Sequence, residues 1–404
     1  MLFDLLPPAP HHFSPEHEAF RATVRSFAER EIAPFAAAWD EAGTFPRELY
    51  AKAAALGLLG MGYPEDYGGT PADVMFSIIA AEELARAGSG GVQASLGTLH
   101  IGLPPVLALG SAELKARVVP PVLRGEKIAA LAITEPGGGS DVAALRTTAI
   151  RESSKSGDHY IVNGEKTFIT SGMRADYITV AVRTDPASRG ANGISLLLVE
   201  GNSPGLERTE LKKTGWWASD TAHLRFTDCR VPATHLLGGP EHTEGEGFKA
   251  IMRNFNHERL VMAASAVGYA QACTEEAAAW ARERKTFGRA LAEHQVIRHK
   301  LVDMVQRVEV AREFVHALAW RLLEQQGAMN EAQQAALVAR TCMAKIQATQ
   351  AMDFCTHEAV QILGGMGFMR GTKSERLYRE VKVMVIGGGS EEVLKDLAAR
   401  QLGL

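Results

Sequence analysis

The distribution of proline divides the 404 residues of this chain into two unlike parts. All 17 prolines lie at or before Pro240, and the 164 residues that follow contain none. Because proline removes a backbone donor and clashes with the preceding helical turn, a long segment without it can form long helices. Apolar residues recur at three-to-four spacing from Val296 to Leu318, and a second such run spans Glu331 to Leu363. We therefore predict a C-terminal four-helix bundle over residues 237–404.

The middle of the chain has the pattern of a β domain. Short β-prone runs separated by Gly, Pro, Asn and Asp are found at Tyr177–Arg183, Gly193–Glu200 and Ala222–Phe226. Two further runs, His159–Val162 and Glu165–Thr170, flank Asn163-Gly164, the dipeptide typical of a type I′ turn, which predicts a hairpin. We expect residues 127–236 to form a β-barrel-like or β-sandwich domain.

The first 126 residues are predicted to be helical. Ser14-Pro15-Glu16 has the residue types of a helix start, and an apolar stripe follows at Phe20, Val24, Phe27 and Ile32. The chain is therefore expected to be an α+β protein of three domains: an all-α domain over 1–126, the β domain over 127–236 and the bundle over 237–404.

Composition excludes several classes of function. The chain has 43 Lys and Arg against 47 Asp and Glu, a net charge of -4, and no basic stripe that could neutralise many phosphates, so a nucleic-acid partner is not expected. Cys229, Cys273, Cys342 and Cys355 are widely spaced, and no His or Cys pair has the spacing of metal ligands, so we expect buried thiols and no metal.

The sequence also lacks the marks of export or of a membrane span. Its uninterrupted aliphatic runs reach only six residues, as at Ile128–Ile133, against the roughly 20 that cross a bilayer. Met1–Leu6 contains Asp4 and is followed by Pro7-Pro8, and the sequence has no basic n-region and no Arg before Arg21, which fits neither a signal nor a transit peptide. We expect a cytoplasmic protein.

Three glycine-rich loops are the main candidates for ligand binding. They lie at Pro136–Asp141, Gly364–Gly367 and Gly387–Ser390. Glycine allows a backbone to approach a flat or anionic ligand closely, and a helix start after the third loop favours phosphate. Each loop alone is more simply a turn. Their combination with Ile133-Thr134-Glu135 and Phe168-Ile169-Thr170 is harder to attribute to chance.

These segments resemble the signatures of the acyl-CoA dehydrogenase family. Ala132–Asp141 fits the first signature, and Gln361–Phe368 with Arg376 and Glu380 fits the second. One position departs, since Gly371 stands where the family has an acidic residue or Asn. Glu283–Gly288, followed by His294-Gln295, is similar to the segment that reaches the FAD of a neighbouring subunit. The resemblance covers essentially the whole chain and implies that family's three-domain fold.

The resemblance implies that FAD is held by three sets of residues. The flavin ring would be lined by Leu131, Ile133, Thr134, Gly139, Ser140, Phe168, Ile169 and Thr170. Contacts from across a subunit interface would come from Arg284, Thr286, Phe287, Gln295, Gln361, Gly364 and Gly365. Ser390 and Glu392 would complete the site. A homo-oligomer, tetrameric in this family, is therefore implied. The alternative for Arg284 is an ordinary surface arginine beside Glu283.

The expected position of the catalytic base differs from that in many members of the family. Where they carry a glutamate before the last helix, this chain has Gly388. Glu258, however, interrupts an apolar helical face that includes Phe255 and Met262, and burial there should raise its pKa toward the working pH, with Arg259 opposing the shift. Asn256–Leu260 resembles the subgroup with isovaleryl- and long-chain acyl-CoA dehydrogenases, whose base lies on this helix. On pattern alone, a structural ion pair with an arginine is an equal alternative.

The resemblance implies dehydrogenation of an acyl-CoA to a trans-2-enoyl-CoA. Glu258 would take the α-proton while the β-hydrogen leaves as hydride to flavin N5, and Gly388 with Gly389 would contact the thioester carbonyl. Ser140, Asn256 and Arg259 would contact the acyl-CoA. Electrons would then pass to an electron-transfer flavoprotein. A flavin oxidase or monooxygenase that uses oxygen, and a catalytically idle acyl-CoA-binding protein, remain alternatives, and acyl length and branching stay open.

Overall fold

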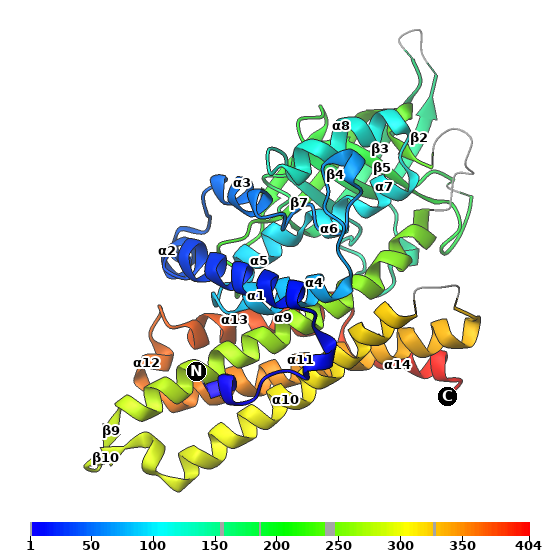
Figure 1. Ribbon diagram of the computed structural model, residues 1–404. Helices are drawn as coiled ribbons and strands as arrows, with labels where there is room; N and C mark the ends of the chain where they lie inside the picture. The colour runs from blue at the N-terminus through cyan, green and yellow to red at the C-terminus, as the bar shows by residue number, and fades with distance from the viewer. Residues whose placement is uncertain (1, 154–156, 186, 239–246, 326–328) are drawn as a thin grey trace.

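The computed structural model describes residues 2–153, 157–185, 187–238, 247–325 and 329–404. Figure 1 shows a sheet with short helices at one end of the molecule and long helices at the other. The longest helix, α9 (Gly247–Glu283), begins beside the sheet and runs into the long helices. One helix therefore connects the sheet to the C-terminal bundle, as the proline-free segment predicts.

The N-terminal part is helical, as expected. Its helices are α1 (Pro15–Phe27), α2 (Ala36–Ala42), α3 (Glu48–Ala55), α4 (Val74–Ala85), α5 (Gly90–Gly97), α6 (Leu99–Gly102), α7 (Pro104–Leu109) and α8 (Ala112–Leu123). The predicted start of α1 is confirmed by a capping box, in which the Ser14 hydroxyl accepts from the His17 amide at 3.3 Å and His17 Nδ1 accepts from the Ser14 amide at 3.0 Å. Val24, Phe27 and Ile32 are buried in the core.

The middle part is one hydrogen-bonded sheet. Its strands are β1 (Ala129–Ala132), β2 (Thr148–Glu152), β3 (His159–Thr170), β4 (Tyr177–Arg183), β5 (Ile194–Glu200), β6 (Leu206–Glu210), β7 (Thr221–Pro232) and β8 (Leu236–Leu237). They follow the order β6-β7-β3-β2-β4-β5-β8, with β1 paired parallel to β4. The sheet is otherwise mostly antiparallel, and the predicted β domain is confirmed.

The hairpin predicted at Asn163-Gly164 is wrong. The two runs form one continuous strand, β3, because both halves pair with the long strand β7. The register between β3 and β7 shifts between Val162 and Gly164, so the dipeptide marks a bulge and not a reversal. Gly164 has φ +141°, and a Cβ there would lie 2.6 Å from Thr147 Oγ1, so glycine is required for close packing against the segment before β2.

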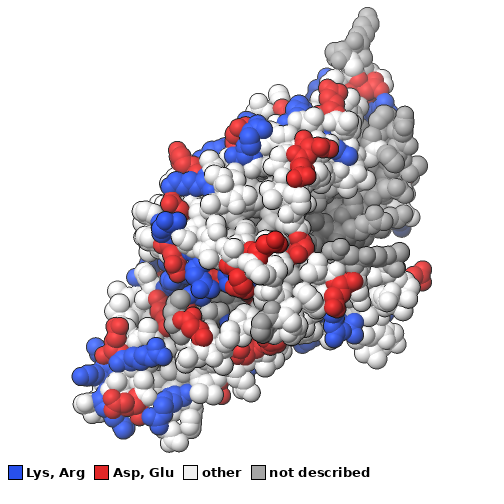
Figure 2. All heavy atoms as spheres, in the orientation of Figure 1, with Lys and Arg blue, Asp and Glu red and all other residues white. Residues whose placement is uncertain are grey.

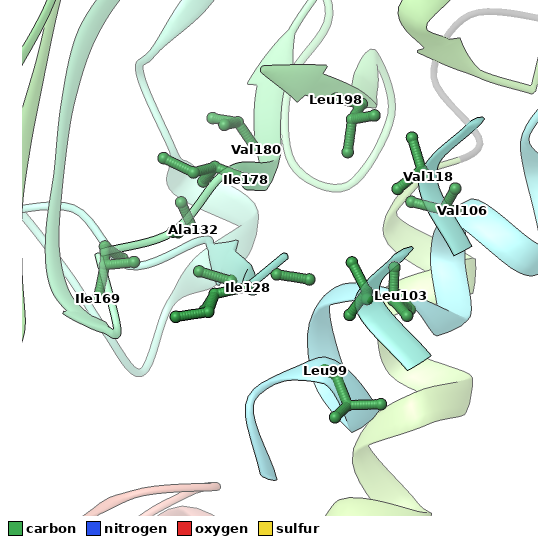
Figure 3. Close-up of a cluster of buried hydrophobic side chains, with 14 of the residues drawn as sticks. Leu99, Leu103, Val106, Val118, Ile128, Ala132, Ile169, Ile178, Val180 and Leu198 are labelled. Atoms are coloured by element: carbon green, nitrogen blue, oxygen red, sulfur yellow. The ribbon is translucent and has the colours of Figure 1, made fainter. Parts of the chain in front are cut away.

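The core of the sheet domain lies between the strands and the helices before it. Leu99 of α6, Val106 of α7 and Val118 of α8 belong to the same buried cluster as Ile178 and Leu198 of the sheet (Figure 3). Strands β4 and β5 are buried along nearly their whole length, which explains their continuous apolar sequences. The first and middle domains therefore share one core.

The C-terminal part is an antiparallel bundle. Its elements are α9, the hairpin strands β9 (Lys285–Thr286) and β10 (Arg289–Ala290), α10 (Gln295–Glu324), α11 (Glu331–Leu363), α12 (Gly365–Phe368), α13 (Lys373–Ile386) and α14 (Glu391–Leu402). Buried alanines are frequent on α9 and α11, which lets these two helices approach closely. Gly268 of α9 faces α4, where an added Cβ would lie 2.6 Å from the Glu82 carbonyl oxygen. The N-terminal domain is thereby joined to the bundle.

One stretch of the described chain, Gly90–Leu109, is long and apolar enough by length and composition alone to cross a membrane. Half of it is buried inside the fold, where it forms α5, α6 and α7. The search of the sequence for uninterrupted aliphatic runs did not find this stretch, because Gly, Gln, Ser, Thr and His residues interrupt it. Burial in the shared core is the ordinary reason for such a composition.

We predict that Gly268→Ala lowers the melting temperature by several degrees. The added methyl group has no room against α4, and overpacking of this kind typically costs about 1–3 kcal/mol. The control is Gly97→Ala on α5, where a Cβ would meet no atom within 4 Å. Thermal unfolding followed by circular dichroism measures both, and equal melting temperatures for the two variants would contradict the close α4–α9 contact.

Candidate active site

A large cavity lies where the three parts of the chain meet. Its volume is approximately 1690 Å³, and it is lined by residues of α4 to α6, of the sheet, of α9 and of the turn between α13 and α14. Most of the sequence-predicted site residues line it, namely Leu131, Ile133, Thr134, Gly139, Ser140, Phe168, Ile169, Thr170, Glu258, Arg259, Gly388, Gly389 and Ser390. The structure thus brings together three separate sequence segments, 131–170, 258–259 and 388–390.

The first glycine-rich segment is held from behind by a buried ion pair. Lys166 is fully buried, and its Nζ donates to the Ile133 carbonyl at 3.0 Å and to Glu135 Oε1 at 2.8 Å. The Thr167 amide donates to the Thr134 carbonyl at 2.9 Å. Glu135 also accepts from the Arg146 and Thr147 amides, which helps hold its pKa below the ordinary value. Thr134 therefore has a fixed backbone position at the cavity wall.

Phe168 is turned into the cavity by an irregularity at the end of β3. The register with β7 shifts between Lys166 and Ile169, and Phe168 has φ +61°, which is rare for an aromatic residue. Its side chain is 70% exposed in the described structure and lines the cavity. Bulges commonly redirect a side chain beside a functional site, and backbone strain is concentrated at such sites.

Glu258 projects from α9 into the same cavity. Its Oε2 is buried and, among the described residues, has no hydrogen-bond partner. Burial raises the pKa of Glu258 to about 7, while the charges of Arg259 and Lys345 oppose the rise. The alternative of a structural ion pair does not hold within the described residues, because Arg259 donates to the Gly388 carbonyl and to Asn256 Oδ1 instead. An unpaired carboxylate with a pKa near 7 can exchange protons at neutral pH.

The turn at Gly387–Gly389 lies beside Glu258's helix and requires glycine. Gly388 has φ +68° and Gly389 has φ +108°. A Cβ at Gly388 would lie 2.8 Å from Met262 Sδ on α9, and a Cβ at Gly389 would lie 2.9 Å from Leu394 Cδ2. Among the residues that the structure describes, no protein acceptor is found for the amides of Gly388 and Gly389. Two backbone donors are therefore available at the cavity.

A neutral polar cluster, which the sequence analysis did not identify, lines the cavity between α4, α5 and α9. Gln93 Nε2 donates to the Ala81 carbonyl and to Ser265 Oγ, both at 2.9 Å, and Gln93 Oε1 accepts from the Tyr269 hydroxyl at 2.5 Å. His100, on α6, also lines the cavity, and burial lowers its pKa to about 4. This region is uncharged at neutral pH.

The remaining predicted residues lie elsewhere. Outside the large cavity, and exposed, are Arg284, Phe287, Gln295, Gln361, Gly364, Gly365 and Glu392, together with the partly exposed Thr286. The β9–β10 hairpin is at the end of the molecule opposite the sheet (Figure 1). Phe287 at its tip is 98% exposed, and charged side chains of both signs surround that end in Figure 2. Within one chain these residues do not join the site.

Asn256 does not line the large cavity, unlike the other predicted substrate contacts. It borders a neighbouring cavity of approximately 240 Å³, together with residues of α9, α10 and α11. Its Oδ1 accepts from Arg259 Nη1 at 3.1 Å. Asn256 therefore contacts the cavity residue Arg259 by a hydrogen bond.

Comparisons with known proteins match the chain along nearly its whole length. The family models described as the N-terminal, middle and C-terminal domains of acyl-CoA dehydrogenase match residues 14–126, 130–229 and 245–403. An acyl-CoA dehydrogenase of Bacillus subtilis is 39% identical over 97% of this chain and 99% of its own length. A probable acyl-CoA dehydrogenase of Mycobacterium abscessus has a TM-score of 0.90 and 46% identity, covering 97% of this chain and 100% of that one. A glutaryl-CoA dehydrogenase of Mycobacterium smegmatis, solved with FADH2, has a TM-score of 0.86 and 26% identity. The match covers 98% of this chain and 96% of that one.

We predict that Glu258→Gln stabilises the fold more at pH 8 than at pH 5. The folded pKa of about 7 exceeds the ordinary 4.5, so the folded chain holds this proton more tightly than the unfolded chain does. Ionisation of Glu258 therefore destabilises the fold increasingly from about pH 4.5 to 7, and the glutamine variant removes that cost. Melting temperatures of both proteins across this range, with the exposed Glu207→Gln as control, measure the effect. A difference that does not change with pH would contradict the buried, unpaired state of Glu258.

Proposed function

The chain belongs to the acyl-CoA dehydrogenase family, and from this we propose that it oxidises an acyl-CoA thioester to the trans-2-enoyl-CoA with FAD as cofactor. The observation that carries the proposal is the buried, unpartnered Oε2 of Glu258, which lines the same cavity as the predicted flavin segments. A carboxylate in such a place is costly for stability and is explained by a role in proton transfer.

The residues of the cavity suit FAD. The hydroxyl-bearing Thr134 and Thr170, the glycine-rich loop that ends in Ser140, and the strained Phe168 all line one cavity. Gly139 of this loop lines the cavity, and a residue without a Cβ there lets a ligand approach the backbone closely. We assign Leu131, Ile133, Thr134, Gly139, Ser140, Phe168, Ile169, Thr170 and Ser390 to the flavin site of their own chain. When bound there, FAD would supply the acceptor for the β-hydrogen, which leaves the substrate as hydride.

Glu258 would remove the α-proton of the substrate. Its Oε2 has no partner among the described residues, so this oxygen has no bond to release before it binds a proton. A pKa near 7 suits this task, because a base titrating near the working pH combines ionisation with proton affinity. Arg259 and Lys345 limit the rise in pKa, which keeps a fraction of Glu258 ionised at neutral pH.

The Gly387–Gly389 turn would stabilise the enolate that forms as the proton leaves. The amides of Gly388 and Gly389 have no acceptor among the described residues, and both glycines line the cavity. Backbone donors aimed at a thioester oxygen stabilise the charge that develops on it. Together with Glu258 they provide the two functions that proton abstraction next to a thioester requires.

We further propose a homo-oligomer in which exposed residues of one chain complete the FAD site of another. Arg284, Thr286, Phe287, Gln295, Gln361, Gly364 and Gly365 are solvent-accessible but lie outside the cavity of their own chain, and Glu392 lies at the start of α14 beside Ser390. Apolar side chains as exposed as those of Phe287 and Phe368 indicate a protein interface. The electron acceptor that we propose for the reduced protein is an electron-transfer flavoprotein.

We predict that Glu258→Gln retains FAD and acyl-CoA binding but reduces the flavin about 10²–10⁴ times more slowly, because it lacks the general base. The measurement is anaerobic stopped-flow mixing with saturated acyl-CoAs of graded chain length, following the loss of flavin absorbance. Glu207→Gln on the edge strand β6 is the matched control and should react like the unaltered protein.

Near-normal reduction by Glu258→Gln would assign the base to another residue. Binding of acyl-CoA to the unaltered protein without loss of flavin absorbance would support an idle binding protein. Reoxidation of the reduced protein by air faster than by an electron-transfer flavoprotein would support an oxidase.

We predict that Arg284→Ala weakens FAD retention about 10- to 100-fold, the cost of a charge-assisted hydrogen bond to phosphate. Arg284 is exposed in one chain, so its loss should leave the melting temperature of the FAD-free protein unchanged. Equilibrium dialysis of FAD measures the effect, and Arg225→Ala in the sheet is the control for loss of an exposed arginine. Unchanged FAD affinity would contradict the shared site.

A further inference from the structure

Two buried cations hold the carbonyl groups of the turn that faces Glu258. Lys345 lies in the middle of α11 with an exposure of 1%, and its Nζ donates to the Val385 carbonyl at 3.0 Å and to the Gly389 carbonyl at 3.1 Å. Arg259 Nε donates to the Gly388 carbonyl at 2.9 Å. The turn is therefore attached to α11 as well as to α9.

These bonds determine where the amides of the turn point. In a trans peptide group the N–H is directed opposite to the C=O. The peptide unit that contains a carbonyl also contains the N–H of the next residue. Since the carbonyls of Gly388 and Gly389 are directed at Arg259 and Lys345, the N–H groups of Gly389 and Ser390 point away from these cations. Three consecutive glycines have large conformational freedom, and nothing in their own side chains restricts it. The two cations supply that restriction.

The charge of Lys345 also acts on Glu258. Lys345 from α11 and Arg259 from α9 both lower the pKa of Glu258, against the rise caused by burial. His257 on α9 and His100 on α6 line the same cavity, and burial keeps His100 uncharged at neutral pH. Burial, followed by repulsion from Arg259, lowers the pKa of Lys345 itself to about 8, and Glu391 of α14 opposes that shift. Lys345 is thus mainly charged at pH 7.

We propose that Lys345 is a positioning residue for the reaction: by binding the carbonyls of Val385 and Gly389, it fixes the Gly387–Gly389 turn at the cavity, and with it the direction of the turn's amides. This inference rests on the proposed function. Lys345 itself does not line the cavity, and it acts through the turn and through Glu258.

The test compares Lys345→Met, which removes both charge and donors, with Lys345→Gln, which removes the charge but keeps a donor. Acetoacetyl-CoA is the probe, because it ionises to an enolate whose bound form gives a long-wavelength absorption with oxidised flavin. Lys300→Met is the matched control, since it removes an ion pair between α10 and α11, with Glu358, far from the turn.

We expect Lys345→Met to raise the apparent pKa of bound acetoacetyl-CoA by about one unit and to lower kcat about tenfold, with KM changed less than threefold. Lys345→Gln should recover part of the enolate absorption. In both variants the acid limb of the pH profile of kcat/KM should move to higher pH, because Glu258 loses a neighbouring positive charge. Lys300→Met should match the unaltered protein in every one of these readouts.

Enolate absorption and pH profiles equal to those of the unaltered protein would overturn the inference, whether or not the melting temperature falls. If Lys345→Met does not fold, Lys345→Gln decides by the same readouts. Failure of the proposed function is a separate result, in which the unaltered protein neither ionises bound acetoacetyl-CoA nor is reduced by any acyl-CoA.

Discussion

The arrangement of this molecule depends on the burial of Glu258, a carboxylate whose Oε2 has no hydrogen-bond partner among the described residues. Removing a charged group from water is costly, and proteins normally neutralise or pair it. Here burial raises the pKa of Glu258 to about 7, and the adjacent Arg259 donates to a backbone carbonyl and to Asn256 instead of to Glu258. Cations are therefore close enough to moderate the pKa of Glu258, yet they leave its Oε2 free to bind a proton.

Each of the three parts of the fold contributes to the site around Glu258. The sheet supplies a rigid wall, where a buried Lys166–Glu135 pair fixes the backbone around Thr134 and a bulge turns Phe168 into the cavity. The helix α9 carries Glu258 and is packed closely against α4 at Gly268. The turn before α14 places two backbone amides near this helix, held by a lysine of α11. The site can therefore form only when all three parts of the chain are folded together.

Much of this could be predicted from the sequence, because the signals are local. The capped start at Ser14 and the proline-free helices follow from residue type and spacing, and Glu258 is identified by its apolar neighbours on one helical face. The predicted hairpin at Asn163-Gly164 failed because pairing with β7 extends across the dipeptide, a long-range contact that local turn preference does not contain. Lys345 is also a charge among the apolar residues of a helix, but its carbonyl partners are 40 and 44 residues away in the chain. The roles proposed for Arg284 and Gln361 require a second chain, so neither the sequence pattern nor one folded chain places these residues in a site.

The central claim is that Glu258 abstracts an α-proton, and hydrogen exchange at the α-carbon tests it most directly. The substrate is 3,3-dimethylbutanoyl-CoA, whose β-carbon carries no hydrogen, so proton abstraction can occur while hydride transfer cannot. In D2O the unaltered protein should introduce deuterium at the α-carbon, detected by mass spectrometry, and the Glu258→Gln variant should not. Exchange at an equal rate in both proteins would contradict the account.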